Sequence, residues 1–167
     1  MSFWGSLGAQ VMDQMMVDFL AEEAKAPAFR HIHAAGAKDY PMMQEMLAQR
    51  QLSLPPAVDL REYIYNMAEV MRAADLALCR AGASTIAELT ALGLPAVMVP
   101  SPYVPNDHQE KNARVLERHG SVKVLLEQEL TGQALYREVQ GLLSDRDALR
   151  DMGRAMLPLG APDAAER

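Results

Sequence analysis

The sequence predicts a doubly wound α/β fold, in which helices cover both faces of a mostly parallel, Rossmann-like sheet. Short apolar runs alternate with amphipathic segments along the chain, and this alternation favours right-handed β-α-β units. The 167 residues suffice for one domain with a buried core and are too few for an eightfold barrel. We therefore expect residues 1–167 to form one domain that binds its ligand beyond the carboxyl ends of the strands.

The first half of the chain predicts an amphipathic helix over residues 9–24, after an N-terminal stub. Apolar side chains recur in that helix at i, i+3, i+4, i+7 and i+8, which puts them on one face: Met12, Met15, Met16, Phe19 and Leu20. Methionines at this spacing indicate core packing rather than a cofactor site. Strands are expected at 31–34 and 57–60, and helices at 39–50 and 66–73. Asn66 and Glu69 have the spacing of a capping box.

The second half continues the alternation to the end of the chain. Strands are predicted at 76–79, 96–99 and 122–126, and helices at 85–92, 107–119, from 131 onward and at 146–156. The helix that opens at Thr131 carries an apolar stripe of Leu135, Val139, Leu142 and Leu143.

Composition and charge exclude several classes of protein. Half of the residues are hydrophobic, 23% are charged, and the formal net charge is −6. A nucleic-acid-binding surface needs a basic patch, so we expect no nucleic-acid partner. The single cysteine, Cys79, rules out an internal disulfide and fits a reducing compartment. No apolar run is long enough to span a membrane, and Met1–Trp4 does not resemble a signal peptide, so a cytoplasmic location is expected.

The first of three unusual loops is Gly5-Ser6-Leu7-Gly8-Ala9. Gly5 and Gly8 permit a tight turn and close approach of a ligand to the backbone. The free N–H groups of the next helix favour a negatively charged ligand there, and Ser6 adds a hydroxyl donor. A turn that needs small residues for packing explains the loop equally well, and the loop matches neither G-x-G-x-x-G nor a Walker A motif.

The second loop leads from the fourth strand to Glu88 on the following helix. Gly82 lets the chain turn into the helix, and the backbone of Ala83, Ser84 and Thr85 offers a second anion cradle. Glu88 lies one turn further on, where its carboxylate could accept two hydrogen bonds from a vicinal diol such as a ribose. Thr85 and Glu88 also match a capping box, and from this loop alone the structural interpretation is the stronger one.

The third loop contains three prolines, which stiffen it, and ends at the helix predicted from Asp107. Asp107 could cap that helix, and His108 and Gln109 could hydrogen-bond the hydroxyl groups of a sugar. The alternative is a polar start to a surface helix.

Together the loops resemble a known family. The resemblance rests on five blocks in order: Gly5-Ser6-Leu7-Gly8-Ala9, Cys79–Thr85 with Glu88, Gly93-Leu94-Pro95-Ala96, Asp107–Ala113 and Pro162–Arg167. These blocks are similar to those of the MurG-type N-acetylglucosaminyltransferases, which make the second lipid intermediate of peptidoglycan. The resemblance covers nearly the whole chain, and its specific part is the second and fourth blocks.

The resemblance implies the C-terminal half of a GT-B glycosyltransferase, which holds the donor UDP-N-acetylglucosamine. The implied contacts to the diphosphate and the sugar come from the first two loops: Gly5, Ser6 and Gly8, then Gly82, Ala83, Ser84 and Thr85. By the same resemblance Glu88 holds the ribose hydroxyls and Ile64 lies by the uracil. His108 and Gln109 reach the transferred sugar, and the donor site needs no tightly bound metal or other cofactor.

The resemblance also implies parts outside this chain. An acceptor domain, with the catalytic base and a membrane-contact patch, would precede Met1, and a last helix would follow Arg167. We therefore expect a UDP-sugar-binding domain without catalytic residues of its own, excised from a two-domain parent and inactive alone. The parent would transfer the sugar with inversion to a lipid-linked acceptor at the cytoplasmic face of the plasma membrane.

The chain departs from the family pattern at four points, and one of them is the strand before the first loop, which is reduced to Met1-Ser2-Phe3. Trp4 precedes Gly5 where the family has a further glycine, and His33-Ala34 stands where His-Gln is common. His108 replaces the first glutamine of a Gln-Gln pair, which bears on the identity of the sugar.

Two other functions remain open at this stage, and a third is disfavoured. A free-standing subunit that pairs with a membrane-anchored acceptor subunit would have the same pocket, and a UDP-sugar epimerase would share the architecture. An NAD-binding domain lacks support because G-x-G-x-x-G is missing. His31 and His33 share one strand face, but no further Cys or His lies at ligand spacing, so no metal site is expected.

Overall fold

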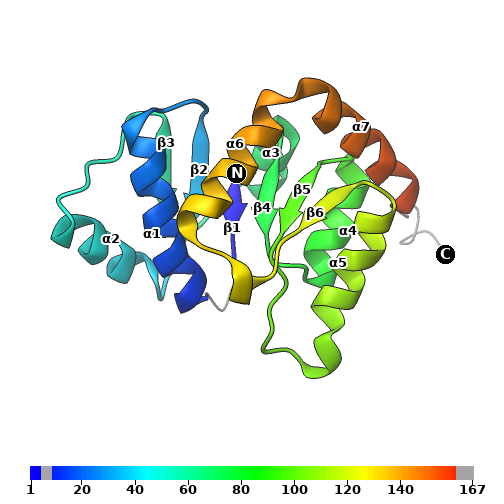
Figure 1. Cartoon of the computed structure of the whole chain (residues 1–167), viewed down its shortest axis with the longest axis horizontal. Helices are drawn as coiled ribbons and strands as arrows, with labels where there is room; N and C mark the ends of the chain where they lie inside the picture. The colour runs from blue at the N-terminus through cyan, green and yellow to red at the C-terminus, as the bar shows by residue number, and fades with distance from the viewer. Residues whose placement is uncertain (5–8, 161–167) are drawn as a thin grey trace.

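The computed structural model describes residues 1–4 and 9–160, and these form one parallel sheet between two layers of helices (Figure 1). The six strands lie in the order β3-β2-β1-β4-β5-β6, and every neighbouring pair is parallel. Their bounds are Ser2–Phe3 (β1), His31–Ala34 (β2), Val58–Arg61 (β3), Ala77–Cys79 (β4), Ala96–Met98 (β5) and Val122–Val124 (β6). The predicted doubly wound α/β fold is therefore confirmed.

Seven α-helices connect and cover these strands in the described part of the chain. Their bounds are Gln10–Lys25 (α1), Tyr40–Gln49 (α2), Met67–Ala73 (α3), Ala83–Leu92 (α4), His108–Arg118 (α5), Gly132–Ser144 (α6) and Arg146–Met156 (α7). Short 3-10 turns lie at Pro105–Asp107 (η1), Glu127–Glu129 (η2) and Leu157–Leu159 (η3). All predicted strands and helices are present, with ends that differ by a few residues.

Each face of the sheet has its own hydrophobic core. On one face α1, α2 and α6 pack on the sheet, and the methionine stripe of α1 lies at its centre, with Met12 and Met16 fully buried. On the other face α3, α4 and α5 pack around residues such as Ala77, Met98 and Leu89. Cys79 is buried in this second core, and burial raises the pKa of its thiol to about 12. The α1 methionines are thus core residues, as predicted.

Two of the expected helix caps are wrong. Helix α4 begins at Ala83, so Thr85 lies inside the first turn and cannot form a capping box with Glu88. The Asn66 side chain precedes α3 as expected, but its amide donates to the Glu69 carboxylate at 2.9 Å instead of capping the backbone. Asp107 lies at the N-cap of α5 without a side-chain capping bond. Thr131 does cap α6, by accepting from Ala134 N.

Candidate functional site

The order of the strands reverses between β1 and β4, at the centre of the sheet. From the centre of the sheet toward one edge the strands follow in the order β1, β2, β3. From the centre toward the other edge they follow in the order β4, β5, β6. In an open parallel sheet the connections diverge at such a point and leave a crevice at the carboxyl edge, where ligands bind. The connections that follow β4 and β5 start from this edge, which faces the bottom of Figure 1, and β1 ends at the same edge. The three loops singled out in the sequence follow these three strands, although Gly5, Ser6 and Gly8 lie outside the described residues.

The N-terminus of α4 has no capping side chain among the described residues. Gly82 is extended at the N-cap and its carbonyl accepts the first helical bond, from Ile86 N at 2.9 Å. The N–H groups of Ala83, Ser84 and Thr85 therefore have no partner inside the helix. Together with the helix dipole, these groups favour a phosphate at this position.

Glu88 shares the exposed face of α4 with Ser84, because the two are four residues apart. Both side chains are exposed, and within the described part of the chain no ion pair or hydrogen bond involves the Glu88 carboxylate. With the capping box ruled out, the contacts of the described residues give Glu88 no structural role. Its carboxylate is free to accept two hydrogen bonds from a ligand.

Arg80 holds together the connections that follow β4, β5 and β6. It is buried directly after β4, and one guanidinium nitrogen donates to the carbonyls of Val99 and Pro100 at 3.0 and 3.2 Å. The other nitrogen donates to the Glu127 carboxylate at 2.5 Å, and both side chains of this pair are about nine-tenths buried. The pair thus fixes where the proline-rich loop leaves the sheet. Sequence reasoning had noted Arg80 only as part of the loop.

The proline-rich loop ends in two successive left-handed residues. Asn106 and Asp107 have φ values of 56° and 50°, a conformation that Asn and Asp adopt more readily than most residues. The chain then enters α5 with His108 exposed, and His108 Nδ1 lies 3.0 Å from the Pro105 carbonyl. Because a carbonyl only accepts, Nδ1 carries the proton, and Nε2 of the neutral ring is an acceptor. Gln109 Oε1 accepts from the backbone N–H of Ser101 at 2.9 Å, which leaves the amide nitrogen available.

The Ile64 side chain is buried in the core beneath α3 and α4, so Ile64 itself can meet a ligand only through its backbone. Its neighbours Tyr63 and Tyr65 are exposed, and their rings lie 5.1 Å apart at the carboxyl end of β3. Sequence reasoning missed these two rings. The signal was present, because two aromatic side chains flank an aliphatic one directly after a predicted strand.

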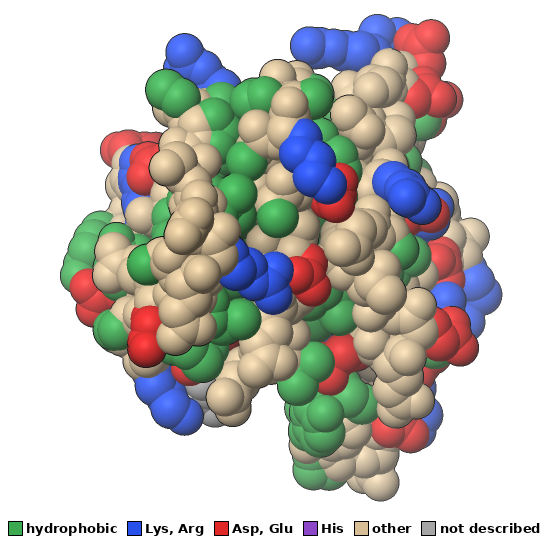
Figure 2. All heavy atoms as spheres, turned by 60° about the vertical axis from the view of Figure 1, so that its left-hand side comes forward, with side chains coloured by type: hydrophobic (Ala, Val, Ile, Leu, Met, Phe, Trp, Pro, Cys, Tyr) green, Lys and Arg blue, Asp and Glu red, His purple; other side chains and the backbone are tan. Residues whose placement is uncertain are grey.

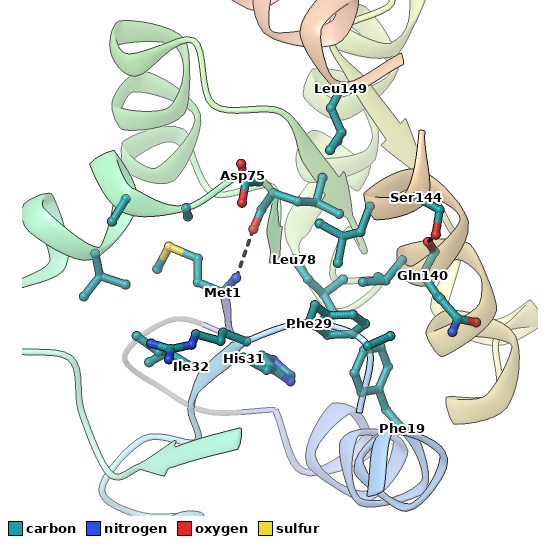
Figure 3. A pocket seen from close by; sticks show the side chains of 18 of the residues that line it. Met1, Phe19, Phe29, His31, Ile32, Asp75, Leu78, Gln140, Ser144 and Leu149 are labelled. Carbon is teal, nitrogen blue, oxygen red and sulfur yellow. Dashed lines mark hydrogen bonds between the residues drawn. The ribbon is translucent and has the colours of Figure 1, made fainter. Parts of the chain in front are cut away.

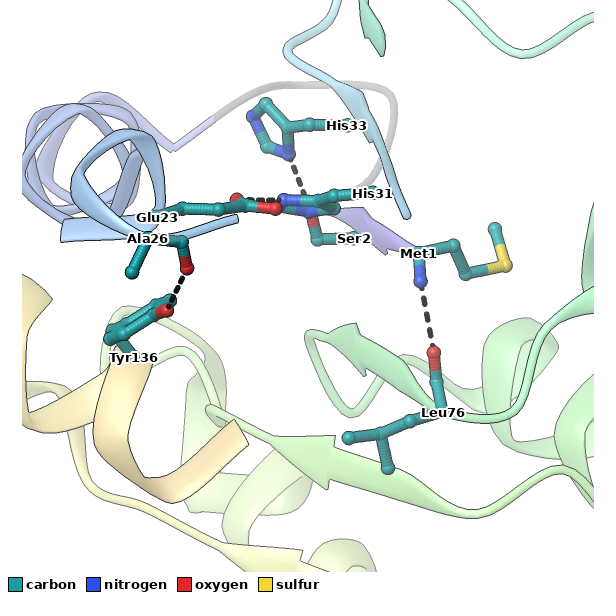
Figure 4. Close-up of polar contacts among 8 residues, drawn as sticks. All are labelled: Met1, Ser2, Glu23, Ala26, His31, His33, Leu76 and Tyr136. Atoms are coloured by element: carbon teal, nitrogen blue, oxygen red, sulfur yellow. Dashed lines mark hydrogen bonds and ion pairs between the residues drawn. The ribbon is translucent and has the colours of Figure 1, made fainter. Parts of the chain in front are cut away.

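A buried chain of hydrogen-bonded side chains, Ser2, His31, His33 and Glu23, lies between strands β1 and β2 and helix α1 (Figure 4). Ser2 Oγ lies 2.7 Å from both His31 Nε2 and His33 Nδ1, and His31 Nδ1 lies 2.7 Å from the Glu23 carboxylate. Desolvation lowers the pKa of His31 to about 3 and lowers that of His33 well below its usual value, so both rings are neutral. Desolvation also raises the pKa of Glu23 to about 7. In the described part of the chain no group of three or more His, Cys, Asp or Glu side chains is arranged to hold a metal ion.

A second buried acid, Asp13, lies on α1 near the same edge as the candidate loops. Neither of its carboxyl oxygens has a hydrogen-bond partner among the described residues. Desolvation, and then the nearby Asp39 carboxylate, raise its pKa to about 7. Sequence reasoning missed Asp13, because beside Gln14 it reads as part of the polar face of an amphipathic helix.

The surface carries no basic patch on the face that Figure 2 shows. Lysine and arginine side chains are dispersed there, and several lie beside aspartate or glutamate side chains. None of the helices in the described residues is long and apolar enough to cross a membrane.

Comparison with known proteins identifies the family. The model of the glycosyltransferase family 28 C-terminal domain matches residues 3–167. The chain belongs to this family. Curated relatives include the UDP-N-acetylglucosamine–N-acetylmuramyl-(pentapeptide) pyrophosphoryl-undecaprenol N-acetylglucosamine transferases of Acetivibrio thermocellus, 39% identical over 165 residues, and of Bacillus cereus, 41% identical over 165 residues. Each match covers 99% of this chain and 44% of the relative, so the chain spans less than half of the length of these relatives.

Solved structures agree with this family 28 assignment. The MurG of Acinetobacter baumannii superposes with a TM-score of 0.81 at 27% identity, over 99% of this chain and 47% of that one. The six-stranded parallel sheet is thus that of the C-terminal half of a GT-B glycosyltransferase, and the chain is homologous to the C-terminal part of MurG. A UDP-N-acetylglucosamine 2-epimerase from Listeria monocytogenes, described as putative, superposes with a TM-score of 0.72 at 15% identity, which shows a shared fold alone.

Proposed function

We propose that this family 28 domain binds UDP-N-acetylglucosamine at the carboxyl edge of its sheet, as the donor half of a MurG-type transferase. The observation that carries the proposal is the N-terminus of α4. There a helix end and the Glu88 carboxylate, neither of which has a side-chain partner among the described residues, share one exposed face beside the switch point of the sheet. The helix end suits a diphosphate, and the carboxylate suits a ribose diol.

Each remaining part of the donor has a matching group. The first loop, with Gly5, Ser6 and Gly8, and the first turn of α4 hold the diphosphate. The backbone at Ile64 holds the uracil, and the exposed ring of Tyr63 offers a surface on which a base can stack. The sugar hydroxyls meet the acceptor nitrogen of His108 and the free amide nitrogen of Gln109.

The parent transferase supplies what this chain does not. In our proposal a second domain binds the lipid-linked peptidoglycan precursor at the cytoplasmic membrane surface and contributes the catalytic base. The donor site holds no tightly bound metal or other cofactor. The domain by itself binds the donor and does not transfer the sugar, because only closure of the two domains excludes water and completes the site.

Calorimetric titration with UDP, UDP-N-acetylglucosamine, UDP-glucose and NAD tests the proposal. We expect the uridine nucleotides to bind and NAD not to bind. Glu88→Gln removes a charged acceptor of two hydrogen bonds and should weaken UDP binding by about tenfold or more. The matched control Glu129→Gln replaces another exposed acid and should leave the affinity unchanged.

Two results would contradict the proposal. One is a folded domain that binds none of the uridine nucleotides at millimolar concentration. The other is UDP binding that is equally tight in Glu88→Gln and in the wild-type chain, which would show that Glu88 does not contact the ligand. Both variants should unfold at the wild-type denaturant concentration, because neither side chain has a partner in the described part of the chain.

A further inference from the structure

The buried polar chain, formed by Glu23, His31, Ser2 and His33, runs from near one edge of the sheet toward the other (Figure 4). Glu23 lies in the last turn of α1, near the amino edge, and His33 lies in the second half of β2, toward the carboxyl edge. Three successive contacts of 2.7 Å join the four side chains. Each polar atom between the two ends therefore has its partner inside the chain.

The surroundings of the buried polar chain exclude water from these contacts. The ring of Phe19 meets the His31 ring edge-on with centroids 5.5 Å apart, and the centroid of the Phe29 ring lies 6.1 Å from it (Figure 3). The other three side chains of the chain have no exposed surface. Because no solvent competes at the internal contacts, the direction of one hydrogen bond determines the direction of the next.

The ionised form of Glu23 sets one direction for all of these bonds. An ionised carboxylate only accepts, so His31 donates from Nδ1, and Nε2 of its neutral ring accepts. The single hydroxyl proton of Ser2 then points to His31, and Ser2 accepts from Nδ1 of His33. Nε2 of the neutral His33 ring is left as an acceptor.

The protonated form of Glu23 sets the opposite direction. The carboxyl group donates to Nδ1 of His31, whose hydrogen is then on Nε2 and is donated to Ser2. Ser2 donates to Nδ1 of His33, and the hydrogen of that ring is on Nε2. Four proton movements connect the two forms. One proton binds to Nε2 of His33, Nδ1 of His33 passes its proton to Ser2, Ser2 passes its own to Nε2 of His31, and Nδ1 of His31 passes its proton to Glu23.

Unpartnered atoms lie at both ends of the chain. Oε1 of Glu23 and Nε2 of His33 are buried and have no hydrogen-bond partner among the described residues. The same is true of Nε1 of Trp4, whose ring lies edge-on to His33 with centroids 6.2 Å apart. Trp4 directly precedes the first loop in the sequence. An acceptor at Nε2 of His33 complements the indole N–H of Trp4, whereas a donor at this position opposes it.

We propose that the buried polar chain is a proton relay that couples the protonation of Glu23 to the environment of Trp4. Uptake of one proton changes Nε2 of His33 from an acceptor to a donor beside the indole ring. Desolvation raises the pKa of Glu23 to about 7, so the reversal falls in the neutral pH range. The relay needs no ligand and does not depend on the proposed donor binding.

Other ionisable groups also face Glu23. The Tyr136 hydroxyl faces it from α6, and burial raises the pKa of this phenol, so it stays neutral. On α1 itself Glu22 is paired with Lys25 at 2.8 Å. The amino group of Met1 favours the ionised carboxylate, and burial lowers the pKa of this amino group to about 6. Because this amino group titrates close to Glu23, the test includes a control for it.

NMR of the full chain labelled with ¹⁵N-histidine tests the proposal, because it distinguishes ring nitrogens that carry a proton from those that do not. Between about pH 8.5 and about pH 5.5 we expect His31 and His33 to stay neutral and to exchange Nδ1–H for Nε2–H together. The transition should be centred near the pKa of Glu23. The indole N–H signal of Trp4, the single tryptophan of the chain, should shift in the same transition.

Three variants and one modification locate the coupling. Glu23→Gln cannot take up a proton and should abolish the transition. Ser2→Ala interrupts the relay, so His31 should still respond to pH while His33 does not. The matched variant Ser2→Thr keeps the hydroxyl group and should retain the response of both rings. Acetylation of the amino group removes its titration and should leave the transition in place.

Three results would overturn the proposal. The first is a wild-type His33 ring that keeps its hydrogen on Nδ1 throughout, because the added proton would then lie on Oε1 of Glu23, outside the chain. The second is a His33 response in Ser2→Ala equal to that of the wild type, because the coupling would not pass through the hydroxyl group. The third is a transition that persists in Glu23→Gln, which would assign the titration to another group.

Discussion

Arg80 should contribute more to stability than any exposed ion pair of this domain. Replacement by Met removes the guanidinium and leaves the Glu127 carboxylate buried without its cation. Breaking one side of a buried pair costs about 3–5 kcal/mol, most of it from the charge left behind. For a domain of this size 1 kcal/mol corresponds to about 2–4 °C, so the melting temperature should fall by about 10 °C.

Urea unfolding of single and double variants measures this contribution. The double variant Arg80→Met/Glu127→Leu has no unpaired charge and should recover about 2 kcal/mol relative to the sum of the two single variants. The matched control Arg61→Met breaks an exposed pair with Asp59 and should cost less than about 1 kcal/mol. A loss below about 1 kcal/mol in Arg80→Met, or strict additivity in the double variant, would refute the reasoning.

Two further predictions concern packing and pH. A Cβ on Gly132 would lie 2.4 Å from Asp18 Cβ and from the Met15 carbonyl oxygen, so Gly132→Ala should cost several kcal/mol by forcing α1 and α6 apart, whereas Gly141→Ala, which meets nothing within 4 Å, should gain up to about 1 kcal/mol. Thermal melts of the pair check this, and equal effects would contradict it. The pKa of Glu23 is raised by folding to about 7 from 4.5, so the acid reduces stability as the pH rises through this range. Glu23→Gln cannot ionise and should gain about 3 kcal/mol relative to wild type between pH 4.5 and pH 7.5 in urea unfolding, and a difference that is independent of pH would contradict this.

Most of the fold could be predicted from the sequence because it depends on local periodicity. The stripe that includes Met12 and Met16 defines α1, and Asp145 caps α7, which begins at Arg146 and ends at Met156 as expected. Parallel strands buried on both faces are continuous apolar runs, which the sequence displays clearly. The strand ends were less certain, because the last residues of each run, such as Val99, continue into a loop without changing character.

The start of α4 was predicted wrongly because the prediction relied on a capping-box pattern that the structure does not use. Thr85 and Glu88 have the spacing of a capping box, so the helix was expected to begin two residues later. In the structure the Gly82 carbonyl accepts the first hydrogen bond of the helix. The side chains of Ala83 and Ser84 give no sequence signal for this start. The error concerns function, since the correct start leaves Glu88 without a structural explanation.

The buried polar chain could not be predicted because its contacts are distant in sequence. Ser2 meets His31 and His33 across 29 and 31 positions, and no periodicity relates strands to a helix in this way. Glu23 was accessible to inspection, because it lies four residues after Phe19 on the buried stripe of α1. A charged residue on such a stripe predicts that it has a buried polar partner, but the sequence does not indicate which residue that partner is.

Arg80 and Glu88 separate the two ways in which a residue can act at the carboxyl edge. Arg80 donates to Val99, Pro100 and Glu127 inside the protein, so we expect it to act on a ligand by positioning the loops after β5 and β6. Glu88 has none in the described part of the chain and can influence a ligand only by touching it. The two variants should therefore differ in which property they change. Arg80→Met should mainly lower the melting temperature, and Glu88→Gln should lower only the affinity for UDP. If both variants lose stability and affinity in proportion, the edge is one cooperative unit, and neither residue can be assigned to positioning or to contact from its hydrogen bonds in the free domain.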